Sequence, residues 1–369
     1  MNPDTPRNAG TRRPVAANVN PPLRLSVLDR SALREGEDIP TAVRATIDMA
    51  RVAERLGFHR FWVAEHHSVP GIAGSAPTVL TAAIASATTT IRVGTGGVML
   101  PNHNPLMVAE QIGTLEALHP GRIDLGIGRS LGFTPAVRTA LGTAALPNDP
   151  AAADEFTRRL QLLLGYLTGE QDTHPGVHAR PGEGARPRPY LLATGSGADT
   201  AAHLGLPLVI APVHGLDRTA ANIARYRHRF TPSPWADRPH VILAQVVAVA
   251  DTATAARDLV VSEAWSTVLS RTSGQFDPLP PPERVSETTK TPRQQRLLDE
   301  SLAGAVYGTP EQVEAGLLRL WDTTGPDELL ITTAAYDRRA QIESWRQLLH
   351  IASTAPTRPE AHETEDPGA

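Results

Sequence analysis

Residues 91–128 read IRVGTGGVMLPNHNPLMVAEQIGTLEALHPGRIDLGIG, and their pattern decides the fold. An apolar run at 91–100 is followed by a segment of helical length at 105–118 and by a second apolar run at 122–128. Continuous apolar strands joined through helices are typical of a parallel sheet that is covered on both faces. The stretch therefore predicts one strand–helix–strand unit.

The same alternation extends over most of the chain. Further strands are predicted at 23–29, 60–65, 190–194, 207–211, 241–250 and 328–332, which makes eight in all. Further helices are predicted at 38–56, 76–88, 150–168, 197–204, 216–229, 252–270, 309–324 and 338–351. Eight such units predict an α/β fold of the (β/α)8 (TIM) barrel type. A doubly wound open sheet is the alternative.

Composition narrows the class of protein. The 369 residues include 35 Lys and Arg against 39 Asp and Glu, and this balance argues against a nucleic-acid partner. There is no cysteine, which excludes disulfides, thiolate metal sites and a cysteine nucleophile. No apolar run approaches the ~20 residues of a membrane span. The Arg12–Arg13 pair is not followed by an apolar segment, so we expect a cytoplasmic enzyme.

Proline and charge mark the ends and the insertions. Residues 1–22 and the acidic residues 355–369 lack apolar periodicity and are expected to be disordered tails of one barrel domain at 23–354. Prolines cluster at 174–189 and within 271–300, and both stretches are interpreted as surface insertions. The second one is a candidate lid, or else a loop without a role.

Polar residues follow the second predicted strand, at the end where TIM barrels carry their active sites. The run is Glu65-His66-His67. A metal site is the first alternative, but successive strand residues point to opposite faces and no H-E-x-x-H helix supports it, so none is predicted. His66 is predicted to be a general acid or base, because an ordinary histidine titrates near neutrality. His67 can simply be solvated.

Glycines and an arginine follow the next strands. Gly96 and Gly97 lie inside the third strand, where they permit either a bulge or the close approach of a flat ligand to the backbone. Arg129 follows the fourth strand, and the turn Thr194-Gly195-Ser196-Gly197 opens a helix after the fifth. Arginine forks and helix-opening glycine turns both suit a phosphate. Together they predict an anion site.

Four blocks in order resemble the bacterial luciferase-like monooxygenase family. They are FWVAEHHSVPGIAGSAP (61–77), the run from 91 to 129, TGSGADTAAHLGLP (194–207) and GTPEQVEAGL (308–317). The resemblance covers the chain from about Leu23 to His350 apart from 271–300, and it is greatest to the subgroup related to the luciferase alpha subunit.

The resemblance implies a barrel that binds reduced FMN and generally dimerises, supplied by a separate flavin reductase. It implies a reaction with O2 through a peroxyflavin that oxidises a small or medium organic substrate. His66 matches the catalytic histidine, and Gly96 and Gly97 match a non-proline cis peptide beneath the flavin ring. Arg129 and Thr194–Gly197 match the residues that hold the FMN phosphate. No residue is implied as a metal ligand.

Two departures from the family pattern bear on function. Gly128 stands where luciferase has a thiol near the flavin, and the phosphate loop is one residue shorter, so light emission is not implied. Two alternatives stay open: a deazaflavin-dependent oxidoreductase on the same fold, and a non-catalytic flavin-binding subunit. Ile72, Leu131 and Phe133 suggest an apolar substrate.

Overall fold

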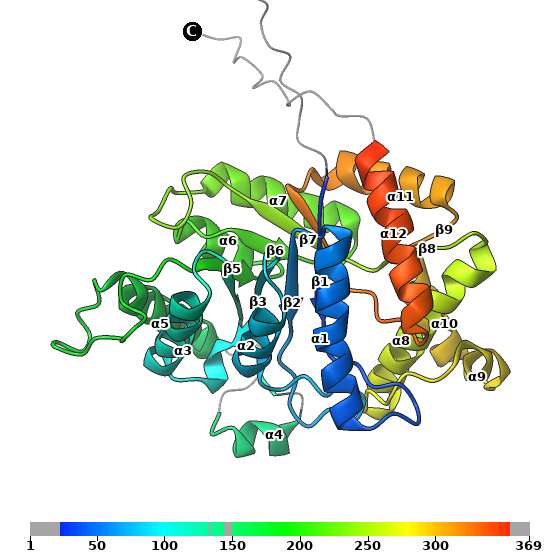
Figure 1. Ribbon diagram of the computed structural model, residues 1–369, viewed down its shortest axis with the longest axis horizontal. Coiled ribbons are helices and arrows are strands. Elements are labelled where there is room, and N and C mark those ends of the chain that lie inside the picture. The colour runs from blue at the N-terminus through cyan, green and yellow to red at the C-terminus, as the bar shows by residue number, and fades with distance from the viewer. Residues whose placement is uncertain (1–22, 133, 144–149, 355–369) are drawn as a thin grey trace, which may run out of the picture.

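Eight parallel strands close into a barrel in the computed structural model, which describes residues 23–132, 134–143 and 150–354 (Figure 1). The strands are β1 (Arg24–Asp29), β2 (Arg60–Val63), β3 (Arg92–Met99), β4 (Ile123–Gly128), β5 (Arg188–Leu192), β6 (Leu208–Ile210), β7 (Val241–Gln245) and β10 (Glu328–Ile331). Their order around the barrel is β1-β10-β7-β6-β5-β4-β3-β2. The predicted TIM barrel is confirmed. The two predicted tails lie outside the described residues.

Helices surround the barrel on its outer face. They are α1 (Ile39–Leu56), α2 (Pro77–Ala87), α3 (Pro105–Leu118), α4 (Pro135–Ala140), α5 (Pro150–Thr168), α6 (Gly197–His203), α7 (Leu216–Arg229), α8 (Ala253–Ser273), α9 (Pro282–Glu287), α10 (Pro292–Ala303), α11 (Pro310–Thr324) and α12 (Arg338–Thr354), with a 3-10 turn η1 (Leu100–Asn102) after β3. The short helices α4, α9 and α10 were not predicted.

Helix α1 shows how local sequence sets these bounds. Asp38 precedes it, and its side chain accepts a hydrogen bond from the amide of Thr41 at 2.7 Å. Gly57 ends the helix with a φ of 92°, a conformation that glycine adopts without steric cost. Ala50 and Ala53 are fully buried against the barrel, as the helical spacing predicts.

The predicted strand at 241–250 is two strands. Its first half is β7 in the barrel, and its second half is β8 (Val247–Val249), which pairs with β9 (Val306–Gly308) in a separate two-stranded sheet. The hydroxyl of Thr333 donates to the carbonyl of Val247 at 2.7 Å and accepts from its amide at 2.9 Å. A single apolar run therefore contributes strands to two sheets. Its hydropathy alone does not show where the first strand ends and the second begins.

The proline-rich stretch 271–300 contains the end of α8, the whole of α9 and most of α10. Prolines begin both short helices, and proline suits the first helical turn because that turn's amides have no partner within the helix. Val285, Leu298 and Trp265 are buried together in a small core beside the barrel. In Figure 1 these three helices gather on one side of the barrel, next to α12.

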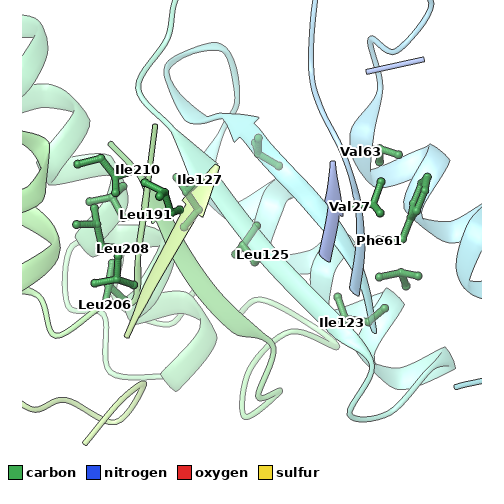
Figure 2. Packing of buried hydrophobic residues seen from close by; sticks show 14 of the residues in the cluster. Val27, Phe61, Val63, Ile123, Leu125, Ile127, Leu191, Leu206, Leu208 and Ile210 are labelled. Carbon is green, nitrogen blue, oxygen red and sulfur yellow. The ribbon is translucent and has the colours of Figure 1, made fainter. Parts of the chain in front are cut away.

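The main core lies between the strands and the helices. On β4, Ile123, Leu125 and Ile127 are fully buried and belong to this layer, with the outward residues of neighbouring strands (Figure 2). Asp124 and Gly126 alternate with them and belong to the barrel interior. The interior is therefore less apolar than the outer layer.

A buried ionic network fills the amino-terminal end of the barrel. Arg60 on β2 forms two hydrogen bonds with Glu328 at 2.7 and 2.8 Å and one with Asp124 at 2.7 Å. Arg92 binds the other oxygen of Asp124, and the hydroxyl of Tyr190 accepts from Arg60 at 2.8 Å. Burial opposes the charge of Glu328, but the guanidinium of Arg60 outweighs it and lowers the pKa of Glu328 to about 2. The network fills the amino-terminal end of the barrel interior. A ligand site would therefore lie at the carboxyl-terminal end.

Candidate active site

His66 follows β2 at the carboxyl-terminal mouth of the barrel. Its side chain is half-buried, and its amide donates to the carbonyl of Gly74 at 2.8 Å. Burial, and then the positive charge of Arg30, lower the pKa of His66 to about 4. The imidazole is therefore neutral at pH 7, with a pKa well below the ordinary value on which the sequence argument depends.

An ion pair joins two elements at this mouth. Arg30 follows β1, and its guanidinium contacts the carboxylate of Glu263 on α8. The same guanidinium lies 5.8 Å from the ring centre of Phe276. The second oxygen of Glu263 accepts from the amide of Ala334, after β10, at 2.8 Å. The loops after the first and last barrel strands are thus tied to α8.

A segment of the predicted insertion crosses these loops. We call residues 276–279 the strap. The amide of Leu279 donates to the carbonyl of Leu33 at 2.8 Å, and the amide of Gly71 donates to the first carbonyl of the strap at 2.8 Å. A Cβ atom on Gly71 would lie 2.4 Å from the carbonyl oxygen of Asp277, so a larger residue there would displace the strap. The strap therefore fastens the loops after β1 and β2.

The peptide bond between Gly96 and Gly97 is cis, as the resemblance implies. The register of β3 against β4 shifts between Thr95 and Val98, so the two glycines form a bulge. A Cβ atom on Gly96 would lie 2.4 Å from a methyl group of Leu28, and one on Gly97 would lie 2.7 Å from backbone atoms of β4. Close packing inside the barrel thus requires both glycines. A flavin ring above them stays a prediction.

Arg129 and the turn Thr194–Gly197 follow neighbouring strands. Gly128 on β4 pairs with Leu192 on β5, so the residues just beyond them lie at the same rim. Arg129 is exposed and, within the described ranges, forms no ion pair. Gly195 has a φ of 60°, and the amides of Gly195 and Ser196 donate to no acceptor among the described residues. An exposed cation and open amides are a donor set for an anion.

Arg225 on α7 supports this turn and was not singled out from the sequence. Its guanidinium donates to the carbonyl of Gly195 at 3.2 Å and to the carboxylate of Asp199 at 2.8 Å. Arg229 contacts the same carboxylate at 3.2 Å. Two arginines thus neutralise the acid in the first turn of α6, which would otherwise repel an anion. Arg225 is 26 residues from Asp199 in the sequence, so no local pattern predicts this contact.

Glu65, next to His66, binds two histidines. The Nε2 atoms of His67 and His103 lie 2.7 and 2.8 Å from the same oxygen, Oε1, and the amide of Met99 donates to Oε2 at 2.8 Å. Burial opposes the charge of Glu65, but these hydrogen bonds outweigh it and hold the pKa below its ordinary value. His67, which the sequence left as a solvated residue, is thus held by a buried carboxylate.

His103 also lines a lateral cavity of about 630 Å³, bounded by η1, the start of α3 and the inner face of α5. The cavity lies beside the barrel, and none of the predicted site residues lines it. A second cavity at the ends of β1 and β10, of about 10 Å³, has room for roughly one water molecule. Ile72 is buried at the mouth, whereas Phe133 lies outside the described residues.

The part of the chain that the structure describes contains neither a candidate metal site nor a candidate membrane span. No group of three or more His, Asp or Glu residues there could hold a metal ion. No helix among those residues is long and apolar enough to cross a membrane.

Comparisons with known proteins extend over most of the chain. A protein of Bacillus subtilis, YvbT, is 36% identical over 328 residues, which are 89% of this chain and 96% of that protein. A luciferase-like monooxygenase of Escherichia coli K12 is 34% identical over 89% of this chain and 97% of its own length. The crystal structure of apo-MsnO8 is similar with a TM-score of 0.78 and 33% identity, over 90% of this chain and 99% of that one.

Two more distant structures share the fold alone. The oxygenating constituent of a Pseudomonas putida 3,6-diketocamphane monooxygenase, solved with FMN, has a TM-score of 0.66 at 18% identity, and the match covers 91% of this chain and 98% of that one. An F420-dependent secondary alcohol dehydrogenase has a TM-score of 0.67 at 15% identity, and the match covers 90% of this chain and 99% of that one.

A sequence model of the luciferase-like monooxygenase family matches residues 23–328. The chain therefore belongs to the luciferase-like monooxygenase family.

Proposed function

We propose that this chain is a flavin-dependent monooxygenase that uses reduced FMN and O2 to oxidise a small or medium organic substrate. One observation carries the proposal: Arg129, which is exposed and has no ion-pair partner among the described residues, stands beside an open glycine turn at the same barrel end as His66. Membership of a monooxygenase family supports the reaction class.

The donor set fits the phosphate of FMN. Arg129 would contribute a charged fork, and the amides of Gly195 and Ser196 would contribute two neutral donors. The carboxylate of Asp199 does not oppose this, because Arg225 and a second arginine pair with it. Bound reduced flavin would supply the two electrons with which O2 is activated.

The protein's own groups would then orient and shield the reacting atoms. His66, neutral at pH 7, can accept or donate one hydrogen bond, and binding of an anionic flavin nearby would raise its pKa. The strap covers the loops after β1 and β2, and we propose that it acts as the lid that keeps water from the mouth. The ion pair of Arg30 with Glu263 would hold that cover in place.

Affinity for two flavins tests the phosphate site. Arg129→Ala should weaken the binding of reduced FMN about tenfold, as expected for loss of an exposed charge-assisted hydrogen bond, and should leave riboflavin unchanged. Arg188→Ala, at the opposite end of β5, is the matched control because Arg188 is exposed as well. Equal losses for FMN and riboflavin, or none, would contradict the assignment.

Reaction with air tests the chemistry. We expect reduced FMN bound to the chain to return to its oxidised absorbance at a rate different from that of free FMN, and to oxidise a trial ketone or thioether. The His66→Ala variant should keep flavin binding and lose substrate oxidation. Turnover without O2, with a deazaflavin coenzyme in place of FMN, would support the alternative that the F420-dependent fold relative raises. If the chain by itself turns over substrate with neither FMN nor the deazaflavin coenzyme, a non-catalytic flavin-binding subunit would be favoured.

Two partners belong to the proposal. We find no dinucleotide-binding glycine motif in the sequence, so a separate flavin reductase would supply reduced FMN. Val79 on α2 and Met107 and Leu118 on α3 are apolar residues that are 69%, 57% and 67% exposed. We propose that this face joins two copies in a homodimer. Sedimentation of the Val79→Glu, Met107→Glu double variant should then show a monomer where the parent is a dimer.

A further inference from the structure

The lateral cavity beside α5 has features of a ligand site that the proposed monooxygenase chemistry does not use. Its volume of about 630 Å³ falls within the range of small-molecule pockets. Leu106, Leu162 and Val177 give it apolar walls, and Arg158, Arg159, His103 and Asn102 contribute polar groups. An apolar cavity with a few converging polar groups is the usual form of a site for an organic ligand.

The cationic wall carries one positive charge in excess. Arg158 and Arg159 both pair with a single carboxylate, that of Glu155, at 2.8 Å. Arg159 also donates through Nη1 to the carbonyls of Pro101 and His103, which fixes its guanidinium on the wall. Nη1 of Arg158 and Nη2 of Arg159 form no hydrogen bond with another described residue. Two guanidinium groups against one carboxylate leave donors and charge for one anionic group.

Asn102 is a fixed polar residue of the same wall. Its Oδ1 atom accepts from the hydroxyl of Thr143 at 3.1 Å, which fixes the orientation of the amide. Its Nδ2 atom has almost no accessible surface, so it does not face the open cavity.

Two rings that lie side by side in nearly one plane complete the cavity lining. The hydroxyl of Tyr166 and Nδ1 of His174 lie 2.9 Å apart, and their rings are parallel to within 8°. This hydrogen bond holds the two rings together in the cavity lining. They offer a flat, mainly apolar surface for an aromatic or aliphatic body.

We propose that this cavity binds a carboxylic acid as a monoanion, with its carboxylate on the two arginines and its apolar body along Leu162 and the rings of Tyr166 and His174. The proposal does not depend on the flavin chemistry, since neither His66 nor Arg129 nor any residue of the phosphate turn lines the cavity.

Calorimetry of the flavin-free chain with benzoate and with its neutral isostere benzamide tests the charge. Benzoate should bind at least about tenfold more tightly than benzamide, as one charge-assisted contact predicts. Butanoate, hexanoate and octanoate probe the apolar walls, and affinity should rise with chain length. Absence of binding by all four acids at about 5 mM would overturn the proposal.

Variants test the location. Arg158→Met should weaken benzoate about tenfold and leave benzamide unchanged. Arg346→Met is its matched control: both arginines pair with an acid three residues earlier on a helix, and their side chains are 58% and 55% exposed. Val177→Trp should block both ligands by filling the cavity. Unchanged benzoate binding in Arg158→Met or Val177→Trp would place the ligand elsewhere and refute the site.

Histidine ring signals in NMR spectra supply a readout without mutation. Only His103 and His174 among the described histidines line the cavity, so benzoate should shift their signals and leave that of His350 unchanged. A uniform shift of all histidines, or none, would contradict binding in the cavity. These outcomes are separate from flavin affinity, so the proposed monooxygenase function can fail without deciding this one.

Discussion

Replacement of Arg60 by methionine should remove most of the stability that the buried ionic network supplies. Arg60 has a side chain only 1% exposed and makes four hydrogen bonds, two of them to Glu328. Without it, Asp124 keeps the guanidinium of Arg92, whereas Glu328 is left buried without a guanidinium partner among the described residues. Breaking a buried pair by removing one partner typically costs about 3–5 kcal/mol.

The pKa of Glu328 gives an independent magnitude. Its folded value is about 2, against an ordinary 4.5, and this difference corresponds to about 3 kcal/mol of stability at neutral pH. Because the folded pKa is lowered, this contribution is present above the unfolded pKa and is lost as the pH falls toward 2. The parent should therefore lose stability between about pH 5 and pH 2, and the Arg60→Met variant should lose much less over that interval.

Urea denaturation followed by circular dichroism provides the assay. We expect a lower midpoint for Arg60→Met at pH 7 and partial recovery in the double variant with Glu328→Gln, because the second change removes an unpaired buried charge. Arg346→Met, which breaks an exposed pair, should cost less than about 1 kcal/mol. A similarly small loss for Arg60→Met, or additive losses in the double variant, would refute the reasoning.

Three further outcomes follow from the geometry. Gly126→Ala should prevent soluble expression or lower the midpoint strongly, because its Cβ would lie 2.1 Å from a carbonyl oxygen of β3, whereas Gly128→Ala, with 3.8 Å of clearance, should fold normally. His66 has a lowered pKa of about 4, so protonation destabilises the fold as the pH falls from 6.5 to 4, and melting temperatures of His66→Gln should vary less over that range. Gly71→Val should displace the strap and speed chymotryptic cleavage after Phe276; an unchanged rate would show that the strap is not fastened there.

Most of the barrel could be predicted from the order of apolar runs and helices. Each of the eight predicted strands contributes to the closed barrel, because hydropathy reports which segments are buried on both faces. The run at 241–250 differs from its prediction, because only its first half lies in the barrel. Hydropathy does not say which sheet a buried strand joins, and here the hydroxyl of Thr333, 86 residues away, holds its second half apart from the barrel.

Part of the candidate site could likewise be predicted from the sequence, and part could not. The sequence by itself determined that His66, Arg129 and the turn at 194–197 follow barrel strands, since the active end of such a barrel is set by chain direction. It also determined the glycines that the β3 bulge requires.

Only the tertiary structure decided which side chains meet. Arg60 and Glu328 are 268 residues apart, and Glu65 and His103 are 38 apart, so no local spacing announces either contact. Closure of the barrel brings these residues together, because strand register and tilt determine which inward side chains share a layer. The low pKa of His66 has the same origin: burial and the charge of Arg30 act through space, whereas sequence patterns report neighbours along the chain.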